Sequence, residues 1–135
     1  MQIPAIRLDS LVLVGDNAHI PAAAVGWYFG SAFPGTNGNV VLFGHLDGPG
    51  GAPRVFAHLD QLRNGDEVRI LTRDWVYVYV VDKIDVTKAN AVEAMAPTGS
   101  PVVTLITCAG PWDPVAATYH ERLVVRATLQ HVEPA

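Results

Sequence analysis

Cysteine is almost absent from this chain, because only one of its 135 residues, Cys108, is a cysteine. A single thiol excludes an internal disulfide, and it excludes the paired-cysteine sites that hold structural zinc. The five histidines show no zinc-type spacing either. We therefore expect neither a metal ion nor any other cofactor.

Positive charge is also scarce. Nine Lys and Arg side chains stand against 13 Asp and Glu, which gives a formal net charge of -4 at pH 7, and the sequence has no basic run. Proteins that bind nucleic acid usually carry a basic patch that neutralises phosphates. Nucleic acid is therefore not expected as a partner.

Long apolar runs are missing as well. The first residues lack the charged and then apolar segments of a signal peptide, and the apolar region 21–33 is interrupted and too short to cross a bilayer. We expect no membrane anchor within this stretch of sequence.

The sequence is instead rich in short apolar segments bounded by Gly, Pro, Asn or Asp. Half of the residues are hydrophobic, which is enough for the core of one domain over residues 1–135. Frequent short strands with little helix predict an all-β fold, either a barrel or a sandwich. The predicted strands are 11–14, 39–43, 68–72, 75–82, 102–107 and 123–129.

One segment has helical rather than strand spacing. The apolar residues of 55–62 predict a short helix packed on the sheet, with His58 on its outward side. The Asn64-Gly65 pair that follows can end this helix with a residue in the left-handed conformation.

Cys108 ends one predicted strand, and Arg122 opens the next. If the two strands pair as antiparallel neighbours, the end of the first lies beside the start of the second. The two side chains then lie close together at the same end of the sheet. Arg126 faces the same way four residues later, but it lies about 13 Å further along the strand, so no catalytic role is expected for it.

A lone cysteine in an apolar strand is more often an inert packing residue than a nucleophile. A catalytic thiol needs a base or a cation nearby, and His45, at the exit of the predicted strand 39–43, is the candidate base. His19, His58 and His131 are more simply surface residues. Spacing alone cannot choose between His45 and His120.

These three residue types suit acyl transfer. A thiolate attacks the carbonyl, and an imidazole, whose unperturbed pKa is about 6.5, donates a proton to the leaving amine and later accepts one. A guanidinium stays charged and offers several donors to the developing oxyanion. We predict Cys108 as nucleophile, His45 as general acid and base, and Arg122 as the oxyanion-stabilising or substrate-positioning group.

Trp112 lies in a Gly-Pro-Trp-Asp-Pro segment soon after Cys108. Its ring could line a substrate groove, or it could hold the loop against the barrel, and the sequence favours neither. Asp47 and Asp113 could orient an imidazole or a guanidinium, or they could simply be solvated.

Several segments together resemble the sortase family in order and spacing. They are Gly-His-Leu-Asp at 44–47, the stretch 55–68, Thr-Leu-Ile-Thr-Cys at 104–108 and Arg-Leu-Val-Val at 122–125. The similarity covers about residues 3–129, and the last two segments are the specific part. The resemblance implies a closed or nearly closed eight-stranded β-barrel with one or two short helices. It assigns the catalytic His, Cys and Arg to His45, Cys108 and Arg122.

The resemblance also implies a function. Sortases are cysteine transpeptidases of the bacterial cell surface that cleave an LPxTG-like sorting signal between Thr and Gly through a thioester, which an amine then resolves. The implied partners are surface proteins with a sorting signal and an amine of a peptidoglycan precursor or a pilin. On this basis Trp112, Thr107 and Asp47 are expected to contact the substrate.

Two finer expectations follow from the same resemblance. The segment 109–113, continuing to Tyr119 and Arg122, is most similar to class F sortases. Sortases normally carry a transmembrane segment outside the catalytic domain. The chain is therefore expected to be the catalytic domain alone, acting at the extracellular face of the cytoplasmic membrane and joined to it only through a segment that this sequence does not include.

Two other functions remain open. One is a different cysteine acyl-transfer enzyme, such as a hydrolase or an L,D-transpeptidase. The latter is expected to have a Ser-His-Gly-Cys element, whereas Cys108 follows Leu-Ile-Thr. The other is a β-barrel binding module without catalysis, in which Cys108 is buried and has no histidine or arginine nearby.

Overall fold

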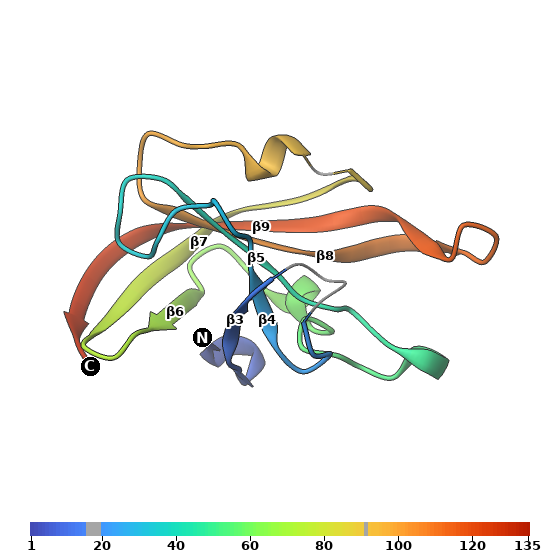
Figure 1. The fold of residues 1–135 in the computed structure, drawn as a ribbon, viewed down its shortest axis with the longest axis horizontal. Helices are drawn as coiled ribbons and strands as arrows, with labels where there is room; N and C mark the ends of the chain where they lie inside the picture. Colours follow the sequence, from blue (N-terminus) through green and yellow to red (C-terminus); the bar gives the residue numbers. More distant parts are fainter. Residues whose placement is uncertain (16–19, 91) are drawn as a thin grey trace.

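The computed structural model describes residues 1–15, 20–90 and 92–135, and these ranges form one curled sheet with short 3-10 helices (Figure 1). The first strands are β1 (Gln2–Ile3), β2 (Leu8–Asp9), β3 (Val12–Val14), β4 (Val25–Trp27) and β5 (Asn39–Phe43). They are followed by β6 (Glu67–Leu71), β7 (Trp75–Lys88), β8 (Val102–Asp113) and β9 (Thr118–Pro134). The 3-10 helices are η1 (Pro4–Ile6), η2 (Pro49–Gly51), η3 (Leu59–Gln61) and η4 (Val92–Met95).

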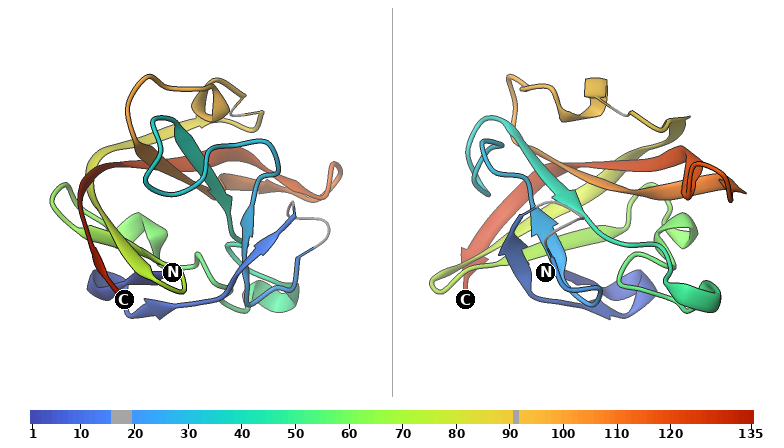
Figure 2. Two further views of the ribbon diagram at one scale, coloured as in Figure 1. Left: turned by 60° about the vertical axis from the view of Figure 1, so that its left-hand side comes forward. Right: turned by 45° about the vertical axis from the view of Figure 1, so that its right-hand side comes forward.

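The strand order in the sheet is β2-β1-β6-β7-β9-β8-β5-β4-β3, and the sheet curls into a half-barrel (Figure 2). The β5–β8 and β3–β4 pairs are parallel, and the other pairs are antiparallel. The expected all-β, barrel-like fold is confirmed. The described residues form nine strands rather than eight, and β1 and β2, with two residues each, are too short to show an apolar pattern in the sequence.

Strands β7, β8 and β9 are longer than the sequence predicts. β7 continues to Lys88, where it pairs with Glu121 of β9, although its second half is rich in charged residues. The expected loop directly after Cys108 is wrong, because β8 continues to Asp113 and forms a hairpin with β9. In both cases pairing with the neighbouring strand, rather than burial, holds the polar residues in extended structure.

The predicted helix over 55–62 is also wrong. The segment forms turns followed by the 3-10 helix η3, because its buried residues Phe56, Leu59 and Leu62 recur every three residues, which is the 3-10 period. His58 is exposed as expected, and Gly65 has the predicted left-handed conformation with φ 99°.

The core has two layers. The larger lies inside the curled sheet and includes Val103, Leu105 and Tyr79, each fully buried. The smaller lies on the outer face, where Ala94 and Met95 of the β7–β8 connection cover Val41, Ile106 and Val124. Strands β5 and β8 are therefore buried on both faces, which explains why their buried segments are largely apolar and do not alternate with exposed polar residues.

A polar network fastens the β7–β8 connection to this outer face. The Asn39 side-chain amide donates to the carbonyl oxygens of Ala94 at 2.9 Å and Ala96 at 3.0 Å. Arg126 donates to the same Ala94 oxygen at 3.0 Å and to the Thr104 hydroxyl at 3.2 Å. Thr104 in turn donates to Asn39 Oδ1 at 2.6 Å. Buried polar groups that are satisfied in this way hold one arrangement of the connection.

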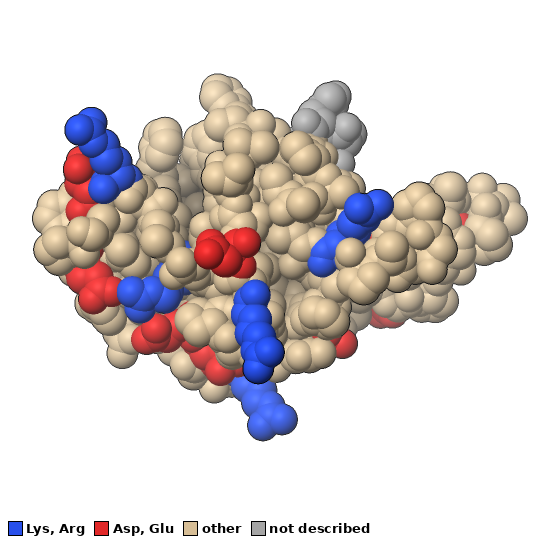
Figure 3. All heavy atoms as spheres, turned by 90° about the horizontal axis from the view of Figure 1, so that it is seen from below, with Lys and Arg blue, Asp and Glu red and all other residues tan. Residues whose placement is uncertain are grey.

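The surface carries both signs of charge. Seen from below, basic and acidic side chains are interspersed and separated by uncharged surface (Figure 3). Lys83 and Asp85 of β7 form one of the exposed ion pairs, at 3.4 Å.

Candidate active site

Cys108 lies in β8, directly opposite Arg122 of β9 in the antiparallel pair. The expectation that these two strands are antiparallel neighbours is therefore correct. Residues opposite each other in such a pair project from the same face of the sheet. The cysteine is free and half-buried, at the point where β8 leaves the core and enters the hairpin.

His45 reaches the same place through the other neighbour of β8. β5 runs parallel to β8 with Phe43 beside Ile106, and the Gly44 amide donates to the Ile106 carbonyl at 3.2 Å. Continuing this register by two residues brings His45 level with Cys108. Both side chains line one cavity of about 570 Å³.

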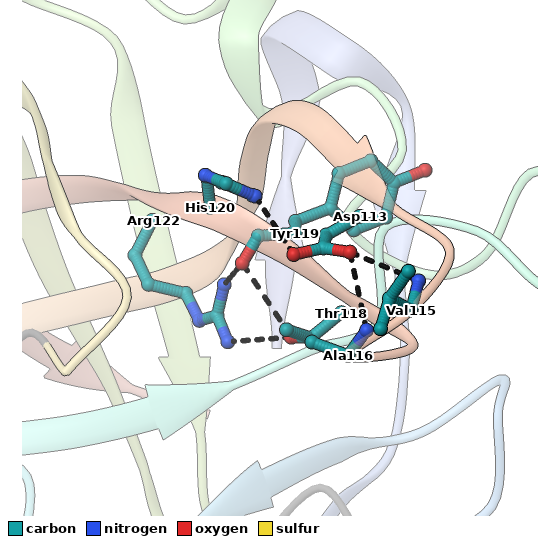
Figure 4. Close-up of polar contacts among 7 residues, drawn as sticks. All are labelled: Asp113, Val115, Ala116, Thr118, Tyr119, His120 and Arg122. Carbon is teal, nitrogen blue, oxygen red and sulfur yellow. Dashed lines mark hydrogen bonds and ion pairs between the residues drawn. The ribbon is translucent and has the colours of Figure 1, made fainter.

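The geometry also separates His45 from the other histidines. His120 projects from the hairpin, where its Nε2 lies 3.2 Å from Asp113 Oδ2 (Figure 4), and it is not among the described residues that line the cavity. His58 lies on the segment before η3, and His131 lies near the end of β9. The position of His19 falls outside the described residues.

The remaining walls of the cavity come from two loops. The loop after β5 contributes Asp47 and residues 48–51, and the β8–β9 hairpin contributes Trp112 and Tyr119. The Tyr119 hydroxyl donates to Asp47 Oδ2, and the Trp112 and Tyr119 rings meet edge to face with centroids 5.0 Å apart. Asp47 and Trp112 thus lie beside Cys108. The sequence named Tyr119 only in the segment that resembles class F sortases, and its position opposite Trp112 needs the hairpin register.

The hairpin has its own supports. Asp113 Oδ1 accepts the Val115 amide at 2.9 Å and the Ala116 amide at 3.1 Å (Figure 4). These amides, followed by His120, hold the pKa of Asp113 below its usual value. A bulge interrupts the pairing between Ala109 and Trp112, and Gly110 there has φ 76°. Only glycine adopts this conformation readily.

The guanidinium of Arg122 lies along the hairpin rather than in the cavity wall. Its Nη1 donates to the carbonyl oxygens of Tyr119 at 3.0 Å and Glu121 at 2.8 Å, and Nη2 lies 3.4 Å from Thr118 Oγ1. Figure 4 shows the ring of Tyr119 pointing away from this guanidinium. Arg122 is therefore next to Cys108 by register, with its donors turned toward main-chain oxygens.

Thr107 does not reach the cavity. Successive residues of a strand face opposite sides, so Thr107 points away from the face of Cys108 and is 1% exposed. Its hydroxyl donates to the Gly44 carbonyl at 2.7 Å. This bond ties the strand of Cys108 to the residue before His45.

Three effects act on the thiol. Burial raises the pKa of Cys108, the Arg122 charge lowers it, and the Asp47 carboxylate raises it again, with the net pKa above the ordinary value. The thiolate is therefore a minor form at neutral pH. The hydrogen bond to Asp47 likewise raises the pKa of Tyr119.

Within the ranges 1–15, 20–90 and 92–135, no three His, Cys, Asp or Glu side chains gather closely enough to hold a metal ion. The cavity itself is lined by a thiol, an imidazole, a carboxylate and a phenol, from Cys108, His45, Asp47 and Tyr119.

The whole arrangement matches a known family. The sequence model of the sortase domain matches residues 1–130. The chain belongs to the sortase family. This family of cysteine transpeptidases also accounts for the fold, since sortase A from Listeria monocytogenes superimposes with a TM-score of 0.85 at 22% identity, covering 99% of this chain and 87% of that one.

Two relatives are more similar in sequence. Sortase D from Bacillus subtilis is 33% identical over 91 residues, which is 63% of this chain and 43% of that protein. Sortase C from Streptococcus pneumoniae, described as a source of insight into catalysis and pilin substrate specificity, has a TM-score of 0.81 at 28% identity, covering 99% of this chain and 68% of that one. The match therefore spans less than half of the curated relative. These named relatives are sortases A, C and D, so class F stays a prediction.

Sortases act at the bacterial cell surface. Among the helices in the described ranges, none has the length and apolarity to traverse a membrane.

Proposed function

We propose that this sortase domain is a cysteine transpeptidase that cleaves a sorting signal of LPxTG type between Thr and Gly and transfers the acyl group to an amine. The observation that carries the proposal is the shared cavity of Cys108 and His45, with Arg122 paired to Cys108 across the sheet. His45 follows β5 and Arg122 lies in β9, and these two strands flank β8 in the sheet. The rigid sheet therefore holds both residues near Cys108.

In the first step, the thiolate of Cys108 attacks the scissile carbonyl carbon. The new S–C bond gives a tetrahedral oxyanion, which collapses with breakage of the C–N bond. A protonated His45 gives its proton to the departing amine. The products are a thioester on Cys108, a released peptide with a free amino group, and a neutral imidazole.

In the second step, the acceptor amine attacks the thioester carbonyl. His45 takes the proton that the amine loses, the S–C bond breaks and the Cys108 thiolate returns. The enzyme is then in the form that began the cycle. Water in place of the amine would give hydrolysis, so the nature of the product distinguishes a transpeptidase from a hydrolase.

Arg122 acts on both steps through its charge. It already favours the Cys108 thiolate against burial and Asp47. To donate to the oxyanion directly, the guanidinium has to turn from the Tyr119 and Glu121 carbonyl oxygens toward the cavity. Loss of such a donor typically costs about 2.7–4 kcal/mol of barrier.

The substrate contacts are assigned to the two loops around the cavity. Trp112 is 53% exposed and offers an aromatic surface to the apolar residues of a sorting signal. Asp47 lines the same cavity. Thr107 supports the site from the buried side of β8. The proposed partners are surface proteins with a sorting signal and an amine of a peptidoglycan precursor or a pilin, at the extracellular face of the cytoplasmic membrane.

The test is incubation with a panel of sorting-signal peptides and amine acceptors, followed by mass spectrometry. We expect cleavage and ligation, lost in Cys108→Ala and His45→Ala. His120→Ala, a histidine outside the cavity, is the matched control and should keep most activity. Cleavage that survives Cys108→Ala would exclude the proposed nucleophile.

The alternative of a binding module without catalysis predicts a Cys108 with no histidine or arginine nearby. The observed neighbours, His45 and Arg122, favour the enzyme. Thiol labelling only after denaturation would favour the binding module.

A further inference from the structure

The cavity of Cys108 is acidic. Asp47 is the one carboxylate among the described residues that line it, and no Lys or Arg is among them. In the described part of the chain, no Lys, Arg or His side chain lies within 4 Å of the Asp47 carboxylate. The guanidinium of Arg54 lies against the main chain of Gly48 in the same loop, but it forms no ion pair with Asp47. The carboxylate therefore faces the cavity without a counter-ion from the described chain.

The Asp47 carboxylate is oriented by the β8–β9 hairpin. The Tyr119 hydroxyl donates to Asp47 Oδ2, and the Trp112 ring packs edge to face on the ring of Tyr119. A carboxylate offers about four acceptor positions on its two oxygens, so one hydroxyl leaves Asp47 able to accept from a ligand. Aromatic faces attract ammonium groups, and the rings of Tyr119 and Trp112 line the same cavity. A carboxylate beside aromatic rings is a combination that suits a cation.

Asp47 opposes the first half of the proposed reaction. Its charge raises the pKa of Cys108 and so disfavours the thiolate that attacks the sorting signal. The sulfur of a thioester carries no charge, so this penalty is absent in the second half. The acceptor that then enters is positive, because a primary amine with a pKa near that of a Lys side chain, about 10.4, is protonated at neutral pH. The charge of Asp47 therefore suits the acceptor.

We propose that Asp47, with Tyr119 beside it, forms the acceptor subsite and binds the ammonium form of a primary amine. The inference rests on the proposed transpeptidase function and narrows its acceptor to a cationic amine. The bound ammonium releases one proton to solvent, and the free amine attacks the thioester carbonyl. His45 takes a second proton as the C–N bond forms and the S–C bond breaks, which yields the amide and the Cys108 thiolate. Asp47 acts on binding, so its effect falls on the KM for the amine rather than on kcat.

The first test compares two acceptors in the ligation reaction at neutral pH and fixed ionic strength. Ethylamine is a cation under these conditions, and hydroxylamine is neutral. Asp47→Asn should raise the KM for ethylamine about tenfold, which corresponds to one lost charge-assisted contact, and should change the KM for hydroxylamine much less. Asp47→Glu, which keeps the charge, should restore part of the preference for ethylamine. Asp74→Asn, at a side chain 75% exposed in the β6–β7 turn, is the matched control and should follow wild type.

The second test measures cation binding without catalysis, by NMR titration with n-butylammonium chloride and with neutral n-butanol. The indole N–H signal of Trp112 is the reporter and is assigned with Trp112→Phe. Trp27, whose indole donates to the Ala32 carbonyl, and Trp75 of β7 are internal controls, because neither is among the described residues that line the cavity. We expect a saturable shift of the Trp112 signal with n-butylammonium alone, and a much weaker one in Asp47→Asn.

The outcomes separate this proposal from the proposed function. Cleavage of sorting-signal peptides with the same rise in KM for both acceptors in Asp47→Asn would leave the transpeptidase in place and overturn the acceptor subsite. The same conclusion follows if n-butylammonium moves all three indole signals alike, or if n-butanol shifts the Trp112 signal equally. If wild type cleaves no peptide, the transpeptidase is wrong and the acceptor role of Asp47 is wrong with it.

Discussion

The thiol of Cys108 is under opposing influences. Burial and the Asp47 carboxylate disfavour its charged form, while the Arg122 guanidinium favours it, and burial is the largest of the three. A cysteine kept mostly neutral is protected from adventitious oxidation, because the thiolate is the reactive form. Its reactivity then depends on what enters the cavity and changes this balance.

The charges of Asp47 and Arg122 give a prediction with two signs. Asp47→Asn removes a group that raises the Cys108 pKa, so alkylation by iodoacetamide should begin at lower pH than in wild type. Arg122→Met removes the group that lowers this pKa, so alkylation should begin at higher pH. The measurement is the labelling rate against pH.

Asp113→Asn is the control for this experiment, because Asp113 lies at the hairpin turn and is not among the described residues that line the cavity. Its profile should follow wild type. Profiles of Asp47→Asn and Arg122→Met that move in the same direction would contradict the electrostatic account.

The sequence predicted the positions of the site better than the directions of its side chains. The sequence alone was enough to pair Cys108 with Arg122, because each residue lies at one end of a recognisable apolar run. The contact of Arg122 with main-chain oxygens, and the burial of Thr107, depend on side-chain geometry that apolar patterns do not encode. The choice of His45 over His120 needed the parallel β5–β8 register.

The β8–β9 hairpin is the element that shapes the cavity. It continues past Cys108 beyond the core and projects from one end of the sheet (Figure 1). Its aromatic pair, Trp112 and Tyr119, lines the same cavity as the loop after β5. The hydrogen bond from Tyr119 to Asp47 is the contact that joins hairpin and loop across the cavity.

Removing that contact should loosen the hairpin. Tyr119→Phe keeps the ring packed on Trp112 but deletes the hydroxyl, and we expect the free energy of unfolding to fall by about 1 kcal/mol. Hydrogen exchange at the hairpin amides should become faster. Tyr28→Phe, at a tyrosine that packs edge to face on Phe43, is the control. Unchanged exchange in Tyr119→Phe would show that the hairpin is held by other contacts.

Arg126 has a structural role at the β7–β8 connection. Arg126→Gln removes donors to the Ala94 carbonyl and the Thr104 hydroxyl, and we expect a loss of about 1–3 kcal/mol in the free energy of unfolding. Urea denaturation measures it. Arg73→Gln, on an exposed turn, should cost almost nothing. Equal stability of Arg126→Gln and Arg73→Gln would show that the hydrogen bonds of Arg126 do not hold the β7–β8 connection in place.

A strand could be predicted from the sequence where its own pattern of apolar residues determines its structure. β5 begins and ends at the predicted residues, because it is apolar from Val40 to Phe43 and has a glycine on each side. The outer half of β7, with Lys83 and Asp85, has no such pattern and is extended because β9 pairs with it. The short strand β4 lies in an apolar region that Gly and Pro interrupt, so it gave no strand signal.

The curled sheet depends on a core shared by strands distant in sequence. Leu105 is fully buried in β8, between β5 and β9. Leu105→Ala should cost about 2–5 kcal/mol through lost burial and the cavity it leaves. Leu71→Ala deletes the same atoms at a residue 43% exposed, and should cost much less. Equal losses in urea denaturation would mean that the core does not centre on β8.

The parallel pairing of β5 with β8 has a consequence for the newly made chain. Such pairing requires the whole crossover between the two strands to be in place before they meet. The imidazole is synthesised long before the sulfur, and the guanidinium last of all. The proposed catalytic centre is therefore incomplete on a chain that is still emerging from the ribosome, and any acyl-transfer capacity arises only when folding is complete.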